Sequence, residues 1–363
     1  MKILHLLYAG GTGGIEKLCK DIGLYSKDVE NHFLFAHTGG KLYEEMSGAH
    51  LPVYLYSYGN KDIVPFRKEL RRLCEKLKVD AVLIHHPAPL FWIACMPLIK
   101  SMKQTAFLVY AHNNYEELTG KKAWKRLLYN KLLKKAAGVV AISEFVKSSV
   151  IKGSKVNPQK VHVVYNGVHV EDYAGVNSIR PKGSLRLLYV GRLIEKKGVQ
   201  VLLEAMERLK EKEEITLSVV GDGSYRMTLE AYVKDKGLEK TVTFYGEQRD
   251  VPAFMQSSDV FVHPAIWEEG FGITLIEAMS AGLICVAFNR GALNEIIVNG
   301  TTGYLVEEVD ADKLSQTILM LLDMTDERFM EMKAMARKRA CGFSIETLLE
   351  QLKLTVKECM DGR

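Results

Sequence analysis

Short apolar runs alternate with longer amphipathic stretches along the whole chain. The runs are rich in Val, Ile, Leu and aromatic residues, and their length and composition predict buried strands. Strands are predicted at 2–8, 32–36, 53–56, 81–84, 105–110, 138–142, 161–165, 185–190, 215–220, 242–245, 260–264, 284–288 and 303–306. The stretches between them have helical spacing, and this alternation predicts an α/β protein with parallel, doubly wound sheets.

The alternation is interrupted once, between residues 171 and 184. This segment loses its periodicity and contains Gly, Asn, Pro and Ser, which is typical of a linker. We therefore expect two Rossmann-like domains, 1–168 and 185–343, a linker at 169–184, and a last amphipathic helix at 344–363. The length of 363 residues is sufficient for two such domains.

A glycine-rich turn between a predicted strand and a predicted helix carries two glutamates, Glu269 and Glu277. Gly270 and Gly272 allow the backbone to turn tightly beside a ligand. The N–H groups at the helix start favour an anion there, and Glu277 lies about one turn further on, within reach of a neighbouring hydroxyl. A sugar nucleotide presents both groups. Alternatively, Glu277 only complements the helix dipole and Glu269 lies in a solvated loop.

Two further loops have the composition of phosphate-binding loops. Arg192 and Lys197 follow a strand and precede a helix, where cations can neutralise a diphosphate, although Lys196 is an alternative to Lys197 and the loop could also be merely solvated. Gly13 and Gly14 end the first strand–helix loop, which could offer N–H groups to a phosphate or could be a plain tight turn.

The first loop does not match a dinucleotide-binding fingerprint. Glu16 stands where its last glycine would be, and the strand at 32–36 ends without an acidic residue. A nicotinamide oxidoreductase is therefore disfavoured. His85 and His86 lack further ligands at metal-binding spacing, and Asp310 of the D-x-D at 310–312 is expected to cap a helix.

Charge is unevenly distributed along the chain. Residues 1–175 contain 25 Lys and Arg against 15 Asp and Glu, whereas the remainder contains 24 against 29, for a net charge of +5 overall. The stretch 121–135 has seven basic residues and no acidic ones. Its apolar residues are predicted to form one helical stripe, composed of Trp124, Leu127, Leu128 and Leu132. This pattern fits either a helix on an anionic membrane surface or a core helix with a solvated basic face.

Other classes of protein find little support in the sequence. No recognised nucleic-acid motif accompanies the basic residues. The longest apolar runs fall short of the roughly 18 residues of a membrane-spanning helix, and the run at 2–8 leads directly into the glycine loop, so it predicts a strand and not a signal peptide. The six cysteines lack C-x-x-C spacing, which favours reduced thiols in a cytosolic setting over disulfides or zinc.

The motifs resemble, in their order along the chain, those of retaining glycosyltransferases of family 4. Glu269 and Glu277 match the E-x7-E signature, the loop 191–198 matches G-R-x-x-x-x-K-G, and 166–168 matches N-G-V. The resemblance implies the GT-B fold, with two Rossmann-like domains of parallel sheet facing a central cleft and a last helix that packs back toward the first domain. It also implies that no cofactor and no metal are needed.

The resemblance also implies roles for individual residues. The catalytic set would be Glu269, His112, Arg192 and Lys197. The donor-binding set would be Gly13, Gly14, Arg192, Lys197, Gly246, Phe271, Gly272, Ile273, Thr274 and Glu277. Glu277 would hold the ribose hydroxyls, and Glu269 would stabilise the cationic sugar. Ala292 and Asn294 depart from the family's G-G-x-x-E turn, which leaves the donor contact of this turn open.

The expected reaction is transfer of a hexosyl residue, with anomeric retention, from a nucleoside diphosphate sugar to a hydroxyl of a saccharide or lipid-linked saccharide. We expect UDP in preference to GDP as the carrier and a role in capsule, exopolysaccharide or lipopolysaccharide synthesis. The expected location is cytoplasmic, at the inner membrane face if 121–135 binds lipid. The alternatives are an epimerase or hydrolase of the same fold and a non-catalytic nucleotide-sugar binding protein.

Overall fold

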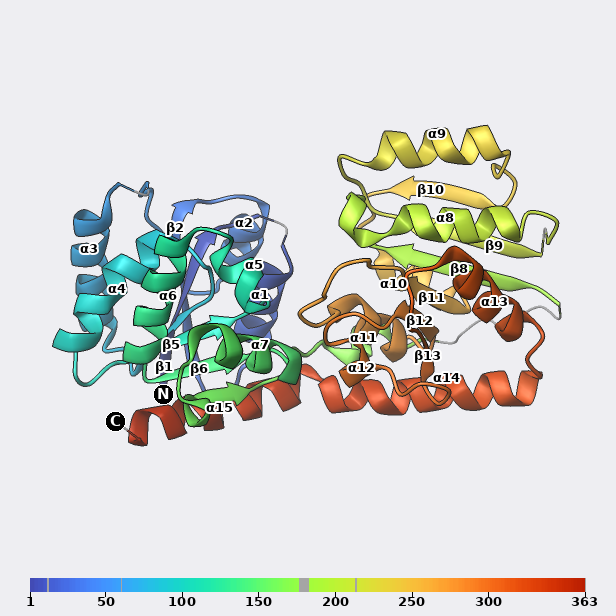
Figure 1. Ribbon diagram of the computed structural model, residues 1–363. Helices are drawn as coiled ribbons and strands as arrows, with labels where there is room; N and C mark the ends of the chain where they lie inside the picture. Colours follow the sequence, from blue (N-terminus) through green and yellow to red (C-terminus); the bar gives the residue numbers. More distant parts are fainter. Residues whose placement is uncertain (12, 60, 176–182, 213, 363) are drawn as a thin grey trace. The chain divides into compact units, whose positions relative to one another are not determined.

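The computed structural model describes residues 1–11, 13–59, 61–175, 183–212 and 214–362 (Figure 1). The chain divides into two compact units. The first consists of 1–167 together with 345–363, and the second of 168–344. The predicted linker 169–184 includes residues 176–182, which lie outside the described residues. In its described part, Val170–Tyr173 forms a 3-10 helix, η2.

The first unit contains a seven-stranded parallel sheet of order β3-β2-β1-β4-β5-β6-β7. Its strands are β1 (Lys2–Ala9), β2 (Glu30–Thr38), β3 (Val53–Leu55), β4 (Ala81–Ile84), β5 (Ala106–Ala111), β6 (Gly138–Ala141) and β7 (Val161–Val163). Its helices are α1 (Gly14–Tyr25), α2 (Lys41–Gly48), α3 (Ile63–Leu77), α4 (Pro89–Ser101), α5 (Tyr115–Thr119), α6 (Ala123–Lys135), α7 (Glu144–Ser154), η1 (Pro158–Lys160) and α15 (Ile345–Asp361). The last of these, α15, packs against α1, β5 and β6.

The second unit contains a six-stranded parallel sheet of order β10-β9-β8-β11-β12-β13. Its strands are β8 (Leu185–Val190), β9 (Ile215–Val220), β10 (Val242–Gly246), β11 (Val260–His263), β12 (Ile284–Phe288) and β13 (Gly303–Val306). Its helices are η3 (Glu195–Lys197), α8 (Val199–Arg208), α9 (Arg226–Lys236), α10 (Val251–Gln256), α11 (Ile273–Ser280), α12 (Leu293–Ile296), α13 (Ala311–Leu322), α14 (Asp326–Ala340) and η4 (Cys341–Phe343).

The predicted fold class, two Rossmann-like domains with parallel sheets, is confirmed. Strands buried on both faces are continuous apolar runs, which is why the sequence shows each of them clearly. All thirteen predicted strands occur in the described residues, with ends that differ by a few residues. Asp310 accepts a hydrogen bond from the Lys313 N–H at 2.8 Å and caps α13, as predicted.

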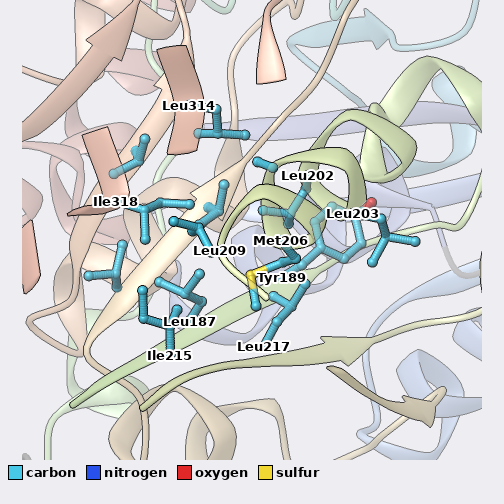
Figure 2. Packing of buried hydrophobic residues seen from close by; sticks show 14 of the residues in the cluster. Leu187, Tyr189, Leu202, Leu203, Met206, Leu209, Ile215, Leu217, Leu314 and Ile318 are labelled. Carbon is cyan, nitrogen blue, oxygen red and sulfur yellow. The ribbon is translucent and has the colours of Figure 1, made fainter. Parts of the chain in front are cut away.

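The core of the second unit lies between the sheet and the helices α8 and α13 (Figure 2). Leu187 and Leu217 project from β8 and β9 toward Leu202 and Met206 of α8, and all four are at most 1% exposed. Burying each such side chain contributes about 1.5–3 kcal/mol. This packing makes the sheet a rigid support for the loops that follow its strands.

Candidate active site

In the second unit, the loop before α8 lies against the residues that follow β11. Gly198 has a φ of +72°, and a Cβ at this position would lie 1.8 Å from the carbonyl oxygen of Pro264. Only glycine fits there. The N–H of Ile266 also donates a hydrogen bond to the carbonyl of Lys196 at 3.1 Å. The backbone of this loop is thereby fixed beside the segment that leads to Glu269.

Glu269 lies buried in a small polar cluster and is only 8% exposed. Its Oε1 forms an ion pair with Lys197, accepts a hydrogen bond from Trp267 Nε1 at 2.9 Å, and lies 3.5 Å from His263 Nε2. Burial alone would raise the pKa of the Glu269 carboxyl, but His263 and Lys197 outweigh it and hold the pKa well below its usual range. Glu269 is therefore an ionised, buried carboxylate and not a solvated loop residue.

The two neighbouring lysines have different partners. Lys197 is half-buried and pairs with Glu269, whereas Lys196 is exposed and places its Nζ 4.5 Å from the centre of the Trp267 ring. Arg192 is exposed, and its guanidinium makes no hydrogen bond or ion pair with another described residue. The geometry thus distinguishes Lys197 from Lys196 and leaves the Arg192 guanidinium available to an anion.

The turn 291–295 supports Glu269 from the other side. Gly291 has a φ of +64°, and a Cβ there would lie 2.1 Å from the Glu269 carbonyl oxygen. That oxygen accepts a hydrogen bond from the Ala292 N–H at 2.9 Å, and the Gly291 N–H donates to Glu268 Oε2 at 2.6 Å. The turn 291–295 therefore positions the backbone of the glycine-rich turn that carries Glu269.

Glu277 is the fifth residue of α11 and is 4% exposed. Its Oε1 accepts a hydrogen bond from the Tyr173 hydroxyl at 2.7 Å. Tyr173 belongs to η2, which packs against α11 within the second unit. Glu277 is therefore buried and hydrogen-bonded beyond the first turn of α11, and it is not a first-turn glutamate that complements the helix dipole.

The amino-terminal end of α11 is open. Gly272, Ile273 and Thr274 are half-buried, and the N–H groups of Ile273 and Thr274 have no hydrogen-bond partner within the described ranges. An anion is favoured at such an end. By contrast, the ring of Phe271 is buried against Phe343, with centroids 5.9 Å apart, so its side chain packs within the protein. Gly246, which is also in the predicted donor set, ends β10.

In the first unit, the turn at Gly13 and Gly14 starts α1, but a carboxylate already lies beside it. Glu16 is 7% exposed, and its Oε2 lies 2.4 Å from the position that a Cβ of Gly13 would occupy. The other oxygen of Glu16 lies 3.2 Å from His86 Nε2. A phosphate placed at the same point would meet a like charge, so the predicted diphosphate contact of this turn stays a prediction.

His112 follows β5 and is 6% exposed. Its Nε2 lies 2.9 Å from Nδ1 of His85, whose Nε2 lies 2.9 Å from Nδ1 of His5. The ring of His112 also stacks on Tyr110, with centroids 4.5 Å apart. His112 is therefore held rigidly at the end of a buried row of imidazoles.

The predicted apolar stripe of α6 is buried only in part. Leu132 is fully buried and Leu128 is half-buried, but Trp124 is 52% exposed and Leu127 is 73% exposed. Tyr129 and Leu133 supply the rest of the buried face. The alternative in which the whole stripe packs into the core is thus wrong, because the amino-terminal part of the stripe faces solvent among the basic residues of the helix.

Two family models match the chain and meet near residue 175. "Glycosyltransferase Family 4" matches residues 12–172, and "Glycosyl transferases group 1" matches residues 176–339. The two matches together span most of the chain. It belongs to glycosyltransferase family 4. The chain is accordingly an enzyme of the glycosyltransferase class.

Characterised relatives of this glycosyltransferase occur in bacteria. It is 32% identical to the Escherichia coli UDP-Gal:alpha-D-GlcNAc-diphosphoundecaprenol alpha-1,3-galactosyltransferase over 57% of this chain and 56% of that one. It is 24% identical to the Campylobacter jejuni N-acetylgalactosamine-N,N'-diacetylbacillosaminyl-diphospho-undecaprenol 4-alpha-N-acetylgalactosaminyltransferase over 94% of this chain and 95% of that one. Among solved structures, Anabaena HepE in complex with UDP has a TM-score of 0.88 at 20% identity and covers 99% of this chain and 100% of that one. This likeness shows the GT-B fold.

The sequence did not identify several residues that hold the candidate side chains in place. Tyr173 lies in the segment assigned to a linker, and its only signal is its position shortly after the N-G-V segment. Trp267 and His263 lie close to Glu269 in the chain, but nothing in their spacing indicates that they contact its carboxylate. His5 lies within an apolar strand, where a lone polar residue is the only signal.

Proposed function

We propose that this glycosyltransferase moves a hexosyl residue from a UDP-sugar to a hydroxyl of a saccharide or lipid-linked saccharide, with anomeric retention, during assembly of a surface polysaccharide. The observation that carries the proposal is the buried, ionised Glu269 paired with Lys197, close in sequence to a helix whose amino-terminal end is open. UDP is favoured as carrier because the HepE structure is a complex with UDP and the Escherichia coli relative is named for UDP-Gal.

Each candidate site residue has a role in the proposed reaction. Arg192 and Lys197 stabilise the negative charge that develops on the departing diphosphate, together with the open N–H groups of α11. Each charge-assisted hydrogen bond contributes about 1.5–3 kcal/mol. Glu277 accepts hydrogen bonds from the ribose hydroxyls. The Glu269 carboxylate stabilises positive charge on the sugar, and His112 contacts a hydroxyl of the sugar or acceptor.

The first experiment is thermal unfolding of the whole chain with UDP, GDP, ADP or NAD, each at about a hundred times its dissociation constant. Binding to the native state alone adds roughly 2.7 kcal/mol at that concentration. We expect UDP to raise the unfolding midpoint. A shift with NAD alone, or with none of the four, would contradict the proposed donor.

Two substitutions test the assigned roles. Glu269→Gln should lower kcat strongly while UDP binding, measured by calorimetry, changes little. Glu277→Ala should weaken UDP binding, because a buried acceptor for the ribose is lost. Glu239→Gln, at an exposed glutamate of the same unit, serves as the matched control. The opposite pattern for the two site variants would overturn the assignment.

The reaction itself is tested by its products. Mass analysis distinguishes a glycosylated acceptor from a free sugar or an epimerised donor, which a hydrolase or an epimerase would yield, and the anomeric coupling of the product reports retention. We further propose that no metal or cofactor is needed. Transfer should then persist after chelation and dialysis.

We also propose that α6 contacts an anionic membrane surface. Trp124 and Leu127 are exposed on a helix that lies within the basic stretch 121–135. Aromatic and aliphatic side chains enter the lipid interface, and each nearby lysine or arginine adds about 1 kcal/mol of attraction to anionic lipid. No helix in the described part of the chain is long and apolar enough to span the bilayer.

A further inference from the structure

Three imidazoles of the first unit form a continuous row of hydrogen bonds across the sheet. His5 lies in β1, and His85 and His112 directly follow β4 and β5. The sheet order places β1, β4 and β5 side by side, which brings together residues that are far apart in the sequence. The nitrogen–nitrogen distances are 2.9 Å for both pairs, and the exposed fraction is 0% at His5, 1% at His85 and 6% at His112.

The direction of these hydrogen bonds is fixed at the His5 end. Asn31 Oδ1 lies 3.0 Å from His5 Nε2, while Asn31 Nδ2 donates a hydrogen bond to the Val29 carbonyl at 3.2 Å. If the amide were flipped, its oxygen would face the Val29 carbonyl and two acceptors would meet. The carbonyl oxygen of Asn31 therefore points to His5, and His5 Nε2 must carry the proton.

The remaining tautomers follow, because a neutral imidazole has one donor nitrogen and one acceptor nitrogen. His5 Nδ1 accepts from the Nε2–H of His85, and His85 Nδ1 accepts from the Nε2–H of His112. The row then ends at Nδ1 of His112, which carries a lone pair. This atom has no hydrogen-bond partner among the described residues.

All three rings are neutral at physiological pH. Burial lowers the pKa of His5 to about 4 and the pKa of His112 to about 3, and it lowers the pKa of His85 far below its usual value. With all three rings neutral, each ring has one donor nitrogen and one acceptor nitrogen, so every hydrogen bond of the row can form.

We propose that Asn31, His5 and His85 are positioning residues that hold His112 as its Nε2–H tautomer, so that its Nδ1 accepts a hydrogen bond from a substrate hydroxyl. This inference rests on the proposed function, in which His112 contacts a sugar. The lone pair on Nδ1 of His112 also restricts which chemical group can bind there. A hydroxyl can donate to the lone pair, whereas a phosphate or carboxylate oxygen would be repelled by it. His112 therefore binds a neutral hydroxyl group and not the diphosphate.

A metal ion is the competing explanation for the same cluster. His5, His85 and Cys19 each offer a ligand atom within 4.8 Å of the others. However, both nitrogens of each of the two histidines already have hydrogen-bond partners, and burial raises the pKa of the Cys19 thiol far above its usual value. Metal ligation needs the thiolate. The row of hydrogen bonds accounts for the cluster without an ion.

The tautomers can be observed directly in the full-length protein. Two-bond proton–nitrogen spectra of protein with ¹⁵N-labelled histidine distinguish the Nε2–H from the Nδ1–H form, and single His→Gln variants assign the signals. We expect His5, His85 and His112 all to be Nε2–H at pH 7. An Nδ1–H or doubly protonated His112 would overturn the proposal, and so would a stoichiometric metal in the purified protein.

Substitution of Asn31 tests whether the far end of the row controls His112. Asn31→Leu should change or mix the His112 tautomer and lower kcat/KM for transfer about tenfold, the effect of roughly one hydrogen bond, with UDP affinity unchanged. His32→Gln is the matched control, because His32 is the next residue of β2, points to the opposite face of the sheet, and is also buried.

The experiments can distinguish failure of the positioning role of Asn31, His5 and His85 from failure of the proposed function. An unchanged His112 tautomer in Asn31→Leu overturns the control by Asn31 even if transfer falls. If the wild-type chain neither binds UDP nor transfers sugar, the proposed function fails, while the wild-type spectra still report the tautomers. If Asn31→Leu does not fold, those wild-type spectra remain decisive.

Discussion

The buried imidazoles should make the first unit markedly less stable as the pH falls from 7 to 5. Histidine has a pKa of about 6.5 in an unfolded chain, whereas the pKa of His5 is about 4 and that of His112 is about 3 in the folded protein. The unfolded state therefore binds more protons than the folded state throughout this range. The contribution to stability is fully present above about pH 6.5 and is lost as the pH falls toward the folded-state values.

The magnitude follows from the same values. At pH 5 the solution is about 1.5 pH units below the unfolded pKa, and each unit corresponds to about 1.36 kcal/mol for each histidine that stays neutral. His5 and His112 should each cost about 2 kcal/mol, or about 4 kcal/mol together. This is a large fraction of the roughly 5–15 kcal/mol that stabilises a typical domain. His85 acts in the same direction, because its pKa is also lowered.

Carboxylates should contribute little to the loss of stability between pH 7 and pH 5. The pKa of the Glu269 carboxyl is held below its usual value, so the stability that its ionised form provides is present above about pH 4.5 and is lost only below it. Glu269 also belongs to the second unit. The loss between pH 7 and pH 5 is thus expected to come mainly from the histidines.

The assay is urea unfolding followed by tryptophan fluorescence in a Trp267→Phe background. The two remaining tryptophans, Trp92 and Trp124, both lie in the first unit, so the signal reports that unit. In this background His112→Gln should reduce the loss between pH 7 and pH 5 by about 2 kcal/mol. An unfolding free energy that does not change with pH, or one that changes equally in both proteins, would refute the reasoning.

Two further predictions concern Tyr173 and the exposed face of α6. Tyr173→Phe removes the hydroxyl that donates to the buried Glu277 and should weaken UDP binding in calorimetry by about tenfold or more, because such a bond to a charged group contributes about 1.5–3 kcal/mol. Tyr232→Phe removes a tyrosine–glutamate hydrogen bond elsewhere in the second unit and should leave UDP binding unchanged. Leu127→Ser should reduce co-sedimentation with anionic vesicles severalfold, whereas Leu354→Ser, at an equally apolar exposed residue of α15, should not. Equal loss in the two leucine variants would argue against α6 as the lipid-binding element.

The fold could be predicted from the sequence because its signals are local. A parallel strand covered on both faces, such as Ile284–Phe288, is a continuous apolar run, whereas an amphipathic helix such as Val199–Arg208 has the longer period. The buried face of a helix is harder to predict, because it depends on contacts with residues far away in the sequence. The sequence of α6 contains two overlapping apolar faces, and only the contacts of Tyr129, Leu132 and Leu133 with the rest of the unit decide which one is buried.

The candidate site was predictable only where its residues lie in one motif. Glu269 and Glu277 are eight residues apart, on either side of a recognisable turn. Their partners come from elsewhere, because Tyr173 is 104 residues from Glu277 and Lys197 is 72 residues from Glu269. His5 and His85 are 80 residues apart and meet only because β1 and β4 pair. Contacts between residues so far apart in the chain cannot be predicted from the spacing of a motif.

The pairing of Lys197 with Glu269 bears on how the Glu269→Gln variant should behave. In the protein without ligand, each residue supplies the charge that the other needs, and such a buried pair is costly to break by removing one partner. An incoming diphosphate offers Lys197 a second anionic partner, so binding draws the lysine away from the carboxylate. Glutamine at position 269 removes that competition, because its amide cannot balance the lysine charge. Nucleotide affinity should therefore be maintained or increase while turnover falls, since the neutral amide cannot stabilise a cationic sugar. If affinity fell together with turnover, Glu269 would be part of the nucleotide site itself.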